Sequence, residues 1–228
     1  MHLIFTAFRA IDKPDVCAEF KQEHNNVLRD YGIVNITSNT ETWMHNPNIY
    51  CVVARESQTN KVVGGVRIQV SDEKTALPVE LAVGKMDEKI YSLVKNFREH
   101  GGVGELNALW NAKSVAGMGV SVLLVRAVIA ISNQIPIHTL MCICADYTIQ
   151  MFKKVGFVID NSLGTSGTFP YPNALYTARV LGIMNPATLE AASETDRERI
   201  LSLRENPVQR FKEKGTTDYI DAEYELTV

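Results

Sequence analysis

The sequence lacks several features that would assign it to a specialised class of protein. No apolar run in its 228 residues is long and uninterrupted enough to span a bilayer. The apolar stretch at residues 3–8 is too short for a signal-peptide core and is soon followed by Asp12-Lys13-Pro14. The charges nearly balance, with 23 Lys and Arg against 26 Asp and Glu, which gives no reason to expect nucleic acid as a partner. We therefore expect a cytoplasmic protein without a membrane span.

Cysteine is scarce, and its spacing does not indicate a metal site. The four cysteines, Cys17, Cys51, Cys142 and Cys144, have no zinc-finger spacing and lie in otherwise structured segments. His138 shares one face of an expected strand with Cys142 and Cys144, but three residues of a single strand make a poor tetrahedral site. We predict no metal site and interpret the cysteines as buried free thiols in a reducing compartment.

Hydrophobic patterning predicts a mixture of strands and helices, with no internal repeat. Strands are expected at residues 3–9, 49–55, 61–70, 105–112, 137–145, 157–161 and 174–181. Helices are expected at residues 12–31, 87–99 and 120–131. Residues 77–83 are a further strand candidate, which Pro78 weakens as a central strand. The helix at 120–131 is apolar almost all round, with Arg126 its only charge, so we expect it inside a large core.

The composition changes beyond Asn185-Pro186, where charged segments with helical signals follow. These signals are a capping box from Thr195 to Glu198 and a helix start at Asn206-Pro207. The sequence therefore predicts one domain at residues 1–184 and a helical C-terminal extension at 185–228.

A glycine turn follows the strand expected at 105–112. Gly117-Met118-Gly119 leaves that strand and enters the apolar helix. Glycines let the backbone approach a ligand closely, and a helix start offers unpaired N–H groups and a positive dipole end. That geometry is typical of a phosphate-binding site. Further on, residues 151–157 read as a short helix that ends at Gly156 and releases the chain into another strand.

The two segments together resemble the acyl-coenzyme A binding core of the GNAT superfamily. Residues 114–119 match its Arg/Gln-x-x-Gly-x-Gly/Ala turn, and Phe152 to Phe157 match its aromatic-x-x-x-Gly-Phe signature. The resemblance implies an α/β (α+β) fold whose mixed central sheet has splayed central strands and is flanked by helices. It also implies an acyl-coenzyme A in the cleft between those strands, its pyrophosphate on the glycine turn and its pantetheine arm along the strand. The implied binding residues are Leu109, Asn111, Ser114, Val115, Ala116, Gly117, Met118, Gly119 and Val120.

Two positions depart from the GNAT pattern. Ser114 stands where Arg or Gln is usual, and although it could cap the helix it cannot make the longer contact to phosphate. Phe152 stands where the family often has a catalytic tyrosine, so it has no proton to give. Tyr147 lies in the same expected helix, and we interpret it as a partly buried structural residue.

Glu105 is the candidate general base that the resemblance implies, because an amine must lose a proton before it attacks a thioester. Strand alternation places Glu105 on one face with Asn107 and Asn111, while Leu106 and Trp110 lie on the other. Asn107 is assigned with Glu105 to the catalytic site, where it could orient substrate or water. The alternatives are an exposed strand-end carboxylate for Glu105 and an ordinary hydrogen-bonding role for the asparagines.

An inserted helix near residues 86–100 is similar to the N-acyl amino acid synthase and acyl-homoserine lactone synthase branch of the superfamily. That branch takes long acyl chains, often from acyl carrier protein. Asn107-Ala108-Leu109 replaces the Ser-Arg-Phe-like signature that this branch would have after the Glu. Lys153-Lys154 is the modest basic patch that could receive an acidic carrier protein.

These observations predict an acyl-coenzyme A-dependent N-acyltransferase, with acetyl-coenzyme A or another acyl-coenzyme A as co-substrate and no metal. Acetyl transfer to an amine of a small molecule or peptide is the first expectation. The alternatives are a long-chain N-acyltransferase that uses acyl carrier protein or acyl-coenzyme A, and a non-catalytic module that binds coenzyme A thioesters. The acceptor pocket is expected around residues 33–48 and 162–173, and a homodimer is left open.

Overall fold

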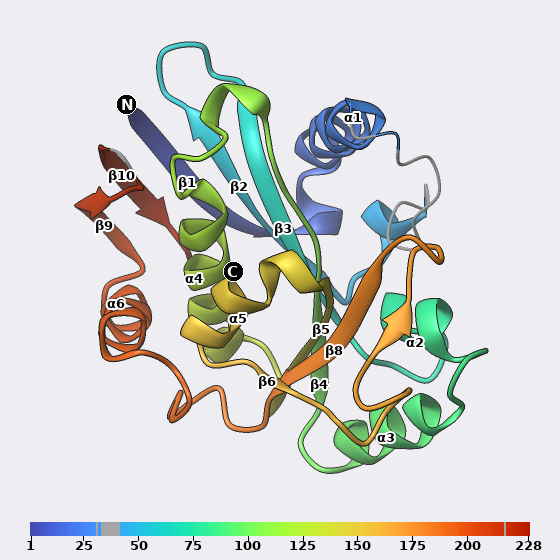
Figure 1. The fold of residues 1–228 in the computed structure, drawn as a ribbon. Coiled ribbons are helices and arrows are strands. Elements are labelled where there is room, and N and C mark those ends of the chain that lie inside the picture. The colour runs from blue at the N-terminus through green and yellow to red at the C-terminus, as the bar shows by residue number, and fades with distance from the viewer. Residues whose placement is uncertain (31, 33–41, 217) are drawn as a thin grey trace.

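The structure is a computed structural model that describes residues 1–30, 32, 42–216 and 218–228. Within these residues the strands form one mixed sheet in the order β6-β8-β5-β4-β3-β2-β1-β10-β9, with β7 paired to β8 (Figure 1). Most neighbours are antiparallel, but β4–β5 and β1–β10 are parallel. The strands are β1 (His2–Arg9), β2 (Ile49–Glu56), β3 (Val62–Val70), β4 (Val103–Asn111), β5 (Thr139–Ala145), β6 (Val158–Ile159), β7 (Phe169–Pro170), β8 (Thr177–Ile183), β9 (Val208–Lys214) and β10 (Tyr219–Glu225).

Helices flank the sheet on both faces. The α-helices are α1 (Pro14–Asp30), α2 (Pro78–Val83), α3 (Lys89–Glu99), α4 (Val120–Ile131), α5 (Ile149–Lys154) and α6 (Glu194–Glu205). Helices α1 and α4 lie on opposite faces (Figure 1). The mixed sheet between helices that the sequence predicts is therefore confirmed. None of the described helices has the length and apolar composition that a bilayer crossing needs.

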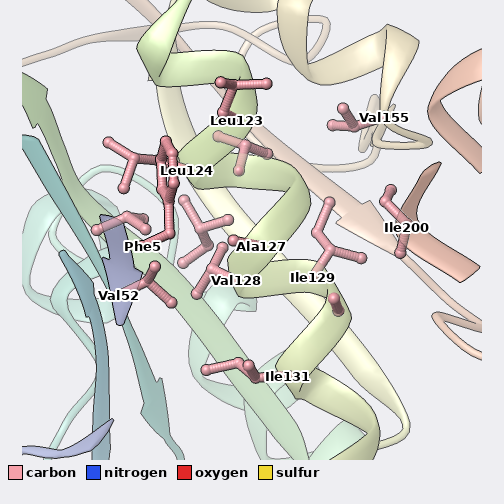
Figure 2. Packing of buried hydrophobic residues seen from close by; sticks show 14 of the residues in the cluster. Phe5, Val52, Leu123, Leu124, Ala127, Val128, Ile129, Ile131, Val155 and Ile200 are labelled. Atoms are coloured by element: carbon pink, nitrogen blue, oxygen red, sulfur yellow. The ribbon is translucent and has the colours of Figure 1, made fainter. Parts of the chain in front are cut away.

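Helix α4 is the centre of the largest hydrophobic cluster. Leu124 and Val128 lie in one cluster with Phe5 and Val52 of the sheet, and Ile200 of α6 belongs to the same cluster (Figure 2). Because α4 is covered on nearly every side, its sequence carries almost no polar residue. The prediction that the helix at 120–131 lies inside a large core is confirmed.

The predicted helical C-terminal extension is wrong beyond α6. Helix α6 begins at the N-cap Ser193, whose hydroxyl accepts from the Asp196 N–H, and not at a capping box from Thr195. Pro207 does not begin a helix, and β9 follows it directly. Strand β10 then pairs in parallel with β1 and extends the central sheet. The physical reason is the alternation in β10, where Ile220, Ala222 and Tyr224 are buried and the intervening residues are not.

Of the strand candidate at residues 77–83, Pro78–Val83 form the helix α2, and Leu77 is its N-cap. Pro78 occupies the first turn of α2, where its missing N–H is not needed. The Glu80 carboxylate accepts a hydrogen bond of 2.7 Å from the Leu77 N–H and so closes the helix start. The glutamate three residues into the segment was the available signal for this helix.

A buried ionic cluster ties the C-terminal hairpin to α4 and α6. Glu213 of β9 accepts hydrogen bonds from Arg199 Nε at 2.5 Å and from the Tyr224 hydroxyl at 2.8 Å. Arg126, the charge of α4, contacts Asp196 at 2.7 Å and Glu213 at 3.5 Å. Each charge in the cluster thus faces an opposite charge away from water.

We expect Glu213→Gln to lower the free energy of unfolding by roughly 3–5 kcal/mol, because it leaves the buried Arg199 without its charge partner. Urea denaturation followed by far-ultraviolet circular dichroism measures this. Glu99→Gln is the matched control, since Glu99 pairs with Lys95 on the exposed surface of α3 and should change stability by less than about 0.5 kcal/mol. Equal effects of the two substitutions would contradict the role of the cluster.

Candidate active site

The two central strands separate part of the way along the sheet. Residues Val103, Gly104 and Glu105 of β4 pair with Thr139, Leu140 and Met141 of β5, and the pairing ends there. The later residues of β4 and β5 therefore diverge, which is the splayed arrangement that the resemblance implied.

A β-bulge in β4 accompanies this separation. Across the β3–β4 pair, Gly65 lies opposite Trp110 and Arg67 lies opposite Asn107, so β4 carries one more residue than β3 over this interval. Ala108 sits in the bulge with φ of +49°, a left-handed conformation that costs a non-glycine residue energy. The bulge bends β4 and increases its twist at the point where β5 leaves it.

The bulge corrects the predicted faces of the strand. Asn111 lies on the α4 side, where its amide oxygen accepts a 2.6 Å hydrogen bond from the Ser121 hydroxyl. Trp110 lies on the α1 side, with its ring 5.6 Å from that of Phe20. Asn111 therefore does not share a face with Glu105, because the extra residue inverts the alternation after Ala108.

A cavity of about 230 Å³ opens where the strands diverge. It is bounded by β4 and β5 and by residues of α1 and α5. Of the predicted site residues, Glu105, Asn107 and Leu109 line it together. The complete lining is His24, Leu28, Pro78, Glu105, Leu106, Asn107, Ala108, Leu109, Ile143, Cys144, Thr148, Phe152 and Tyr171.

Glu105 is buried in the wall of this cavity, with 0% of its surface exposed. Its Oε2 accepts a 2.8 Å hydrogen bond from the Val79 N–H, while Oε1 has no hydrogen-bond partner among the described residues. Burial raises the pKa of Glu105 to about 8, opposed by the Val79 hydrogen bond and the positive charge of Arg67 and assisted by Glu80. The alternative of an exposed strand-end carboxylate is therefore wrong.

Asn107 lies beside Glu105 on the same wall. Its amide nitrogen donates to the Glu105 carbonyl oxygen at 3.1 Å. Its Oδ1 is buried and, within the described part of the chain, accepts no hydrogen bond. Two residues of the cavity wall thus each carry a buried oxygen without a hydrogen-bond partner among the described residues.

Phe152 faces the same cavity but belongs to the hydrophobic core. It is 4% exposed and packs edge-on against Phe157, with ring centroids 5.3 Å apart. Tyr147 is 81% exposed and precedes α5 in a short 3₁₀ segment, so its interpretation as a partly buried residue of that helix is wrong.

The glycine turn has the backbone geometry expected of a phosphate cradle. Gly117 and Gly119 have φ of +75° and +92°, which favour glycine. The N–H groups of Val115, Ala116 and Met118 donate to carbonyls within the turn. Gly117 and Gly119 donate to no backbone carbonyl of the described residues, so these two N–H groups are the better placed for an anion.

Two polar side chains beside the turn, those of Lys113 and Ser114, are exposed. Ser114 is exposed and does not cap α4, whose N-cap is Gly119. Lys113 Nζ lies 3.0 Å from Asp30 of α1. The turn is also covered by the C-terminal hairpin, because the Thr216 N–H donates to the Met118 carbonyl at 3.3 Å. No sequence signal connected these two segments.

A second and larger cavity of about 920 Å³ lies on the α1 side of the sheet. Arg67 lies in its wall, 2% exposed, with its guanidinium 4.1 Å from the Trp43 ring centroid. Burial lowers the pKa of Arg67 to about 10, so it remains charged at neutral pH. Pro78 lines both cavities. The complete lining is Thr42, Trp43, His45, Asn46, Pro47, Asn48, Ile49, Arg67, Gln69, Asp72, Glu73, Lys74, Thr75, Ala76, Pro78 and Leu81.

The residues expected to form the acceptor pocket are divided between the two cavities and the hydrophobic core. Trp43 and His45 line the larger cavity, whereas Tyr171 lines the smaller one and Phe169 is buried against α2 and α3. Residues 33–41 of the expected pocket lie outside the described residues. Arg67 was missed, because an arginine in an otherwise apolar strand was the only signal. No cluster of three metal-ligating side chains occurs in the described residues.

Comparison with known proteins assigns the fold but no sequence family. No protein-family model matches the chain, and no curated protein matches it by sequence. Among solved structures it is similar to FeeM, an N-acyl amino acid synthase from uncultured soil microbes, with 13% identity, a TM-score of 0.60, and 82% of this chain and 99% of FeeM covered.

Two further structures resemble the chain at comparable levels. The coenzyme A-dependent acyl-homoserine lactone synthase BjaI is 12% identical, with a TM-score of 0.55, over 97% of this chain and 94% of BjaI. An acyl-coenzyme A N-acyltransferase from Pseudomonas aeruginosa is 11% identical, with a TM-score of 0.54, over 79% of this chain and 98% of that protein. The splayed sheet, the glycine turn and these similarities together show that the chain has the fold of the GNAT-type N-acyltransferases.

Proposed function

We propose that the protein transfers an acyl group from a coenzyme A thioester to the amine of a small acceptor that carries a carboxylate, such as an α-amino acid. The observation that carries the proposal is the position of Glu105. This buried carboxyl group lines the smaller cavity and interacts electrostatically with Arg67, which lines the larger one. The proposal places the thioester in the smaller cavity and the acceptor in the larger.

The donor side rests on β4 and the glycine turn. Beyond Glu105 the edge of β4 is not paired with β5, so the amides of the pantetheine arm can bind there as an added strand. Gly117 and Gly119 would receive the pyrophosphate through their N–H groups. The smaller cavity, at about 230 Å³, favours a short acyl group such as acetyl.

The acceptor side rests on Arg67. A buried guanidinium stacked on Trp43 supplies a fixed positive charge for a carboxylate. Glu105 lies near enough to Arg67 to affect its pKa, so an acceptor amine close to its own carboxylate would be held within reach of both groups. The similarity of the fold to an N-acyl amino acid synthase agrees with this class of acceptor.

The proposed reaction requires Glu105 to accept a proton. Its ionised form takes a proton from the acceptor ammonium, and the free amine attacks the thioester carbonyl carbon. The new C–N bond forms and the C–S bond breaks, the nitrogen loses a second proton as it becomes an amide, and the departing sulfur gains one. A carboxyl pKa of about 8 lies closer to the pKa of an ammonium than the ordinary value of 4.5 does. The smaller difference in pKa favours this proton transfer.

Two other functions compete with this proposal. A long-chain transferase that uses acyl carrier protein would dock the acidic carrier at the exposed Lys153 and Lys154 of α5. A binding module would hold the thioester without turnover. Acyl transfer from acetyl-coenzyme A across a panel of amino acids and amines, compared with an acyl-carrier-protein donor, separates the three.

Glu105→Gln should reduce kcat/KM at pH 8 by about 10²–10⁴-fold, because it removes the proposed base and keeps the hydrogen bond from Val79. In the unmodified protein kcat/KM should rise with pH through about 8. Steady-state rates between pH 6 and 10 measure both effects. Unchanged activity of the variant would remove Glu105 from the mechanism.

Glu105→Gln should lower activity but raise the stability of the folded protein at high pH. The folded protein keeps the Glu105 proton up to about pH 8, whereas the unfolded chain releases it near 4.5, so stability falls as pH rises through this interval. Gln is always neutral, and at pH 9 the variant should be more stable by roughly 2–4 kcal/mol. Denaturant unfolding at pH 5 and pH 9 tests this, and a pH-independent difference would contradict it.

Gly119→Ala should weaken coenzyme A binding by at least about tenfold, because a side chain strains the backbone at φ of +92° and so shifts the N–H groups of the turn. Gly32→Ala is the matched control, since Gly32 has φ of +68° and an added Cβ would meet no atom of the described residues within 4 Å. Isothermal titration with coenzyme A compares them. Equal loss in both variants would indicate general destabilisation.

Arg67→Met should raise KM for amino acid acceptors by roughly 10–100-fold through loss of a charge-assisted contact. It should raise KM much less for the corresponding decarboxylated amines, which have nothing for Arg67 to bind. The measurement is the ratio of kcat/KM for tyrosine and tyramine, or for another matched pair that the protein accepts. An unchanged ratio would show that Arg67 does not bind the acceptor carboxylate.

A further inference from the structure

The smaller cavity lacks a phenol at Phe152, yet the departing coenzyme A sulfur needs a proton. Cys144, at the end of β5, lines the same cavity as Phe152 and Thr148 and is 8% exposed. The cavity wall also carries the buried Glu105 Oε1 and Asn107 Oδ1, neither of which is hydrogen-bonded within the described residues. The Cys144 thiol therefore shares this cavity with two residues whose buried oxygens could accept hydrogen bonds from bound substrates.

We propose that the Cys144 thiol is the proton donor to the leaving sulfur of coenzyme A, an inference that rests on the acyl transfer proposed above. As the C–S bond of the thioester breaks, its electron pair goes to the coenzyme A sulfur, which takes the Cys144 S–H proton. The nitrogen loses a second proton as it becomes an amide, and the Cys144 thiolate takes that proton, directly or through water. The thiol is thus restored, the coenzyme A leaves as a thiol, and Glu105 holds the first proton of the ammonium until it exchanges with solvent.

The other groups in the cavity are less suitable donors. The Thr148 hydroxyl already donates to the Ala145 carbonyl at 2.8 Å, and an alcohol is a much weaker acid than a thiol. His24 has its pKa lowered to about 3 by burial and by Arg67, so it is neutral. Tyr171 also lines the cavity and packs against the cluster of α2 and α3, and a phenol is ordinarily a weaker acid than a thiol.

The surroundings of Cys144 adjust its acidity. A hydrogen bond with Cys142 lowers the pKa of Cys144, burial opposes this, and the Thr148 side chain lowers it further. Asp146 raises the pKa and Arg179, which pairs with Asp146 at 2.9 Å, lowers it. A thiol with a pKa below its ordinary value is well matched to another thiol as proton acceptor, since proton transfer works best between groups of similar pKa.

Dependence on the leaving group tests the proposal. Cys144→Ser should lower kcat with acetyl-coenzyme A by about 10²-fold. With the thioester S-phenyl thioacetate the loss should be less than about threefold, because thiophenolate leaves without a proton. The decline of the unmodified protein's rate at high pH, where Cys144 ionises, should disappear in the variant. Cys51→Ala is the control, because Cys51 is a buried thiol outside the cavity.

Several outcomes would overturn the assignment. Equal losses with both donors would show that Cys144 only shapes the cavity, and a leaving-group effect in Tyr171→Phe alone would transfer the role to that phenol. An acetyl adduct on Cys144 in rapidly quenched intact-mass spectra would make it a nucleophile.

A binding measurement keeps this inference separate from the acyl transfer itself. Saturating coenzyme A should slow alkylation of Cys144 by iodoacetamide at least about tenfold if the thiol lies at the coenzyme A sulfur. Protection without turnover would support the placement of Cys144 and refute the proposed transferase. Turnover without protection would refute the role of Cys144 alone.

Discussion

The β-bulge at Ala108 is the constraint on which the rest of the site depends. It adds a residue to β4 a few positions after Glu105, the last residue that pairs with β5, and the two central strands diverge there within a continuous sheet. The divergence opens a cavity between β4 and β5. Phe152 and Leu106 contribute apolar surface to the wall of this cavity. The left-handed backbone at Ala108 costs energy, and structures retain such strain where it shapes a site.

Helix α4 connects this cleft to the more distant glycine turn. Its N-terminus begins at Gly119, and its apolar body fills the core between the sheet and α6. The C-terminal hairpin contacts both α4 and the glycine turn. Glu213 forms an ion pair with Arg126 of α4, and the Thr216 N–H donates to the Met118 carbonyl. The hairpin is thus part of the sheet and also contacts the glycine turn, so a segment far along the sequence lies beside the turn.

The sequence was a good guide where a structural feature depends on local residues. Helix α4 was predicted because twelve successive positions carry one consistent pattern, and the glycine turn because only glycine tolerates its φ values. The face of Asn111 was predicted wrongly because a bulge formed by Ala108 leaves no mark in composition. The C-terminal hairpin was missed because β9 is charged and mostly exposed, and the partner that makes it a strand is β10. The cavities themselves come from elements distant in sequence, which no local pattern encodes.

Glu105 lines the smaller cavity and Arg67 the larger one, and burial shifts their pKa values in opposite directions. Burial favours the neutral carboxyl and weakens the charged guanidinium, and their mutual attraction does not fully offset either effect. A carboxylate bound at Arg67 would cancel the positive charge beside Glu105 and raise its pKa further, whereas an ammonium beside Glu105 would lower it. A zwitterionic acceptor supplies both charges, so its binding would leave Glu105 close to its resting pKa while placing a proton to be removed next to it. An amine without a carboxylate would favour the ionised Glu105 and the ammonium together, a stable ion pair that resists proton transfer. If Glu105 and Arg67 have the roles proposed above, these electrostatics would favour an acceptor with both groups over one with the amine alone.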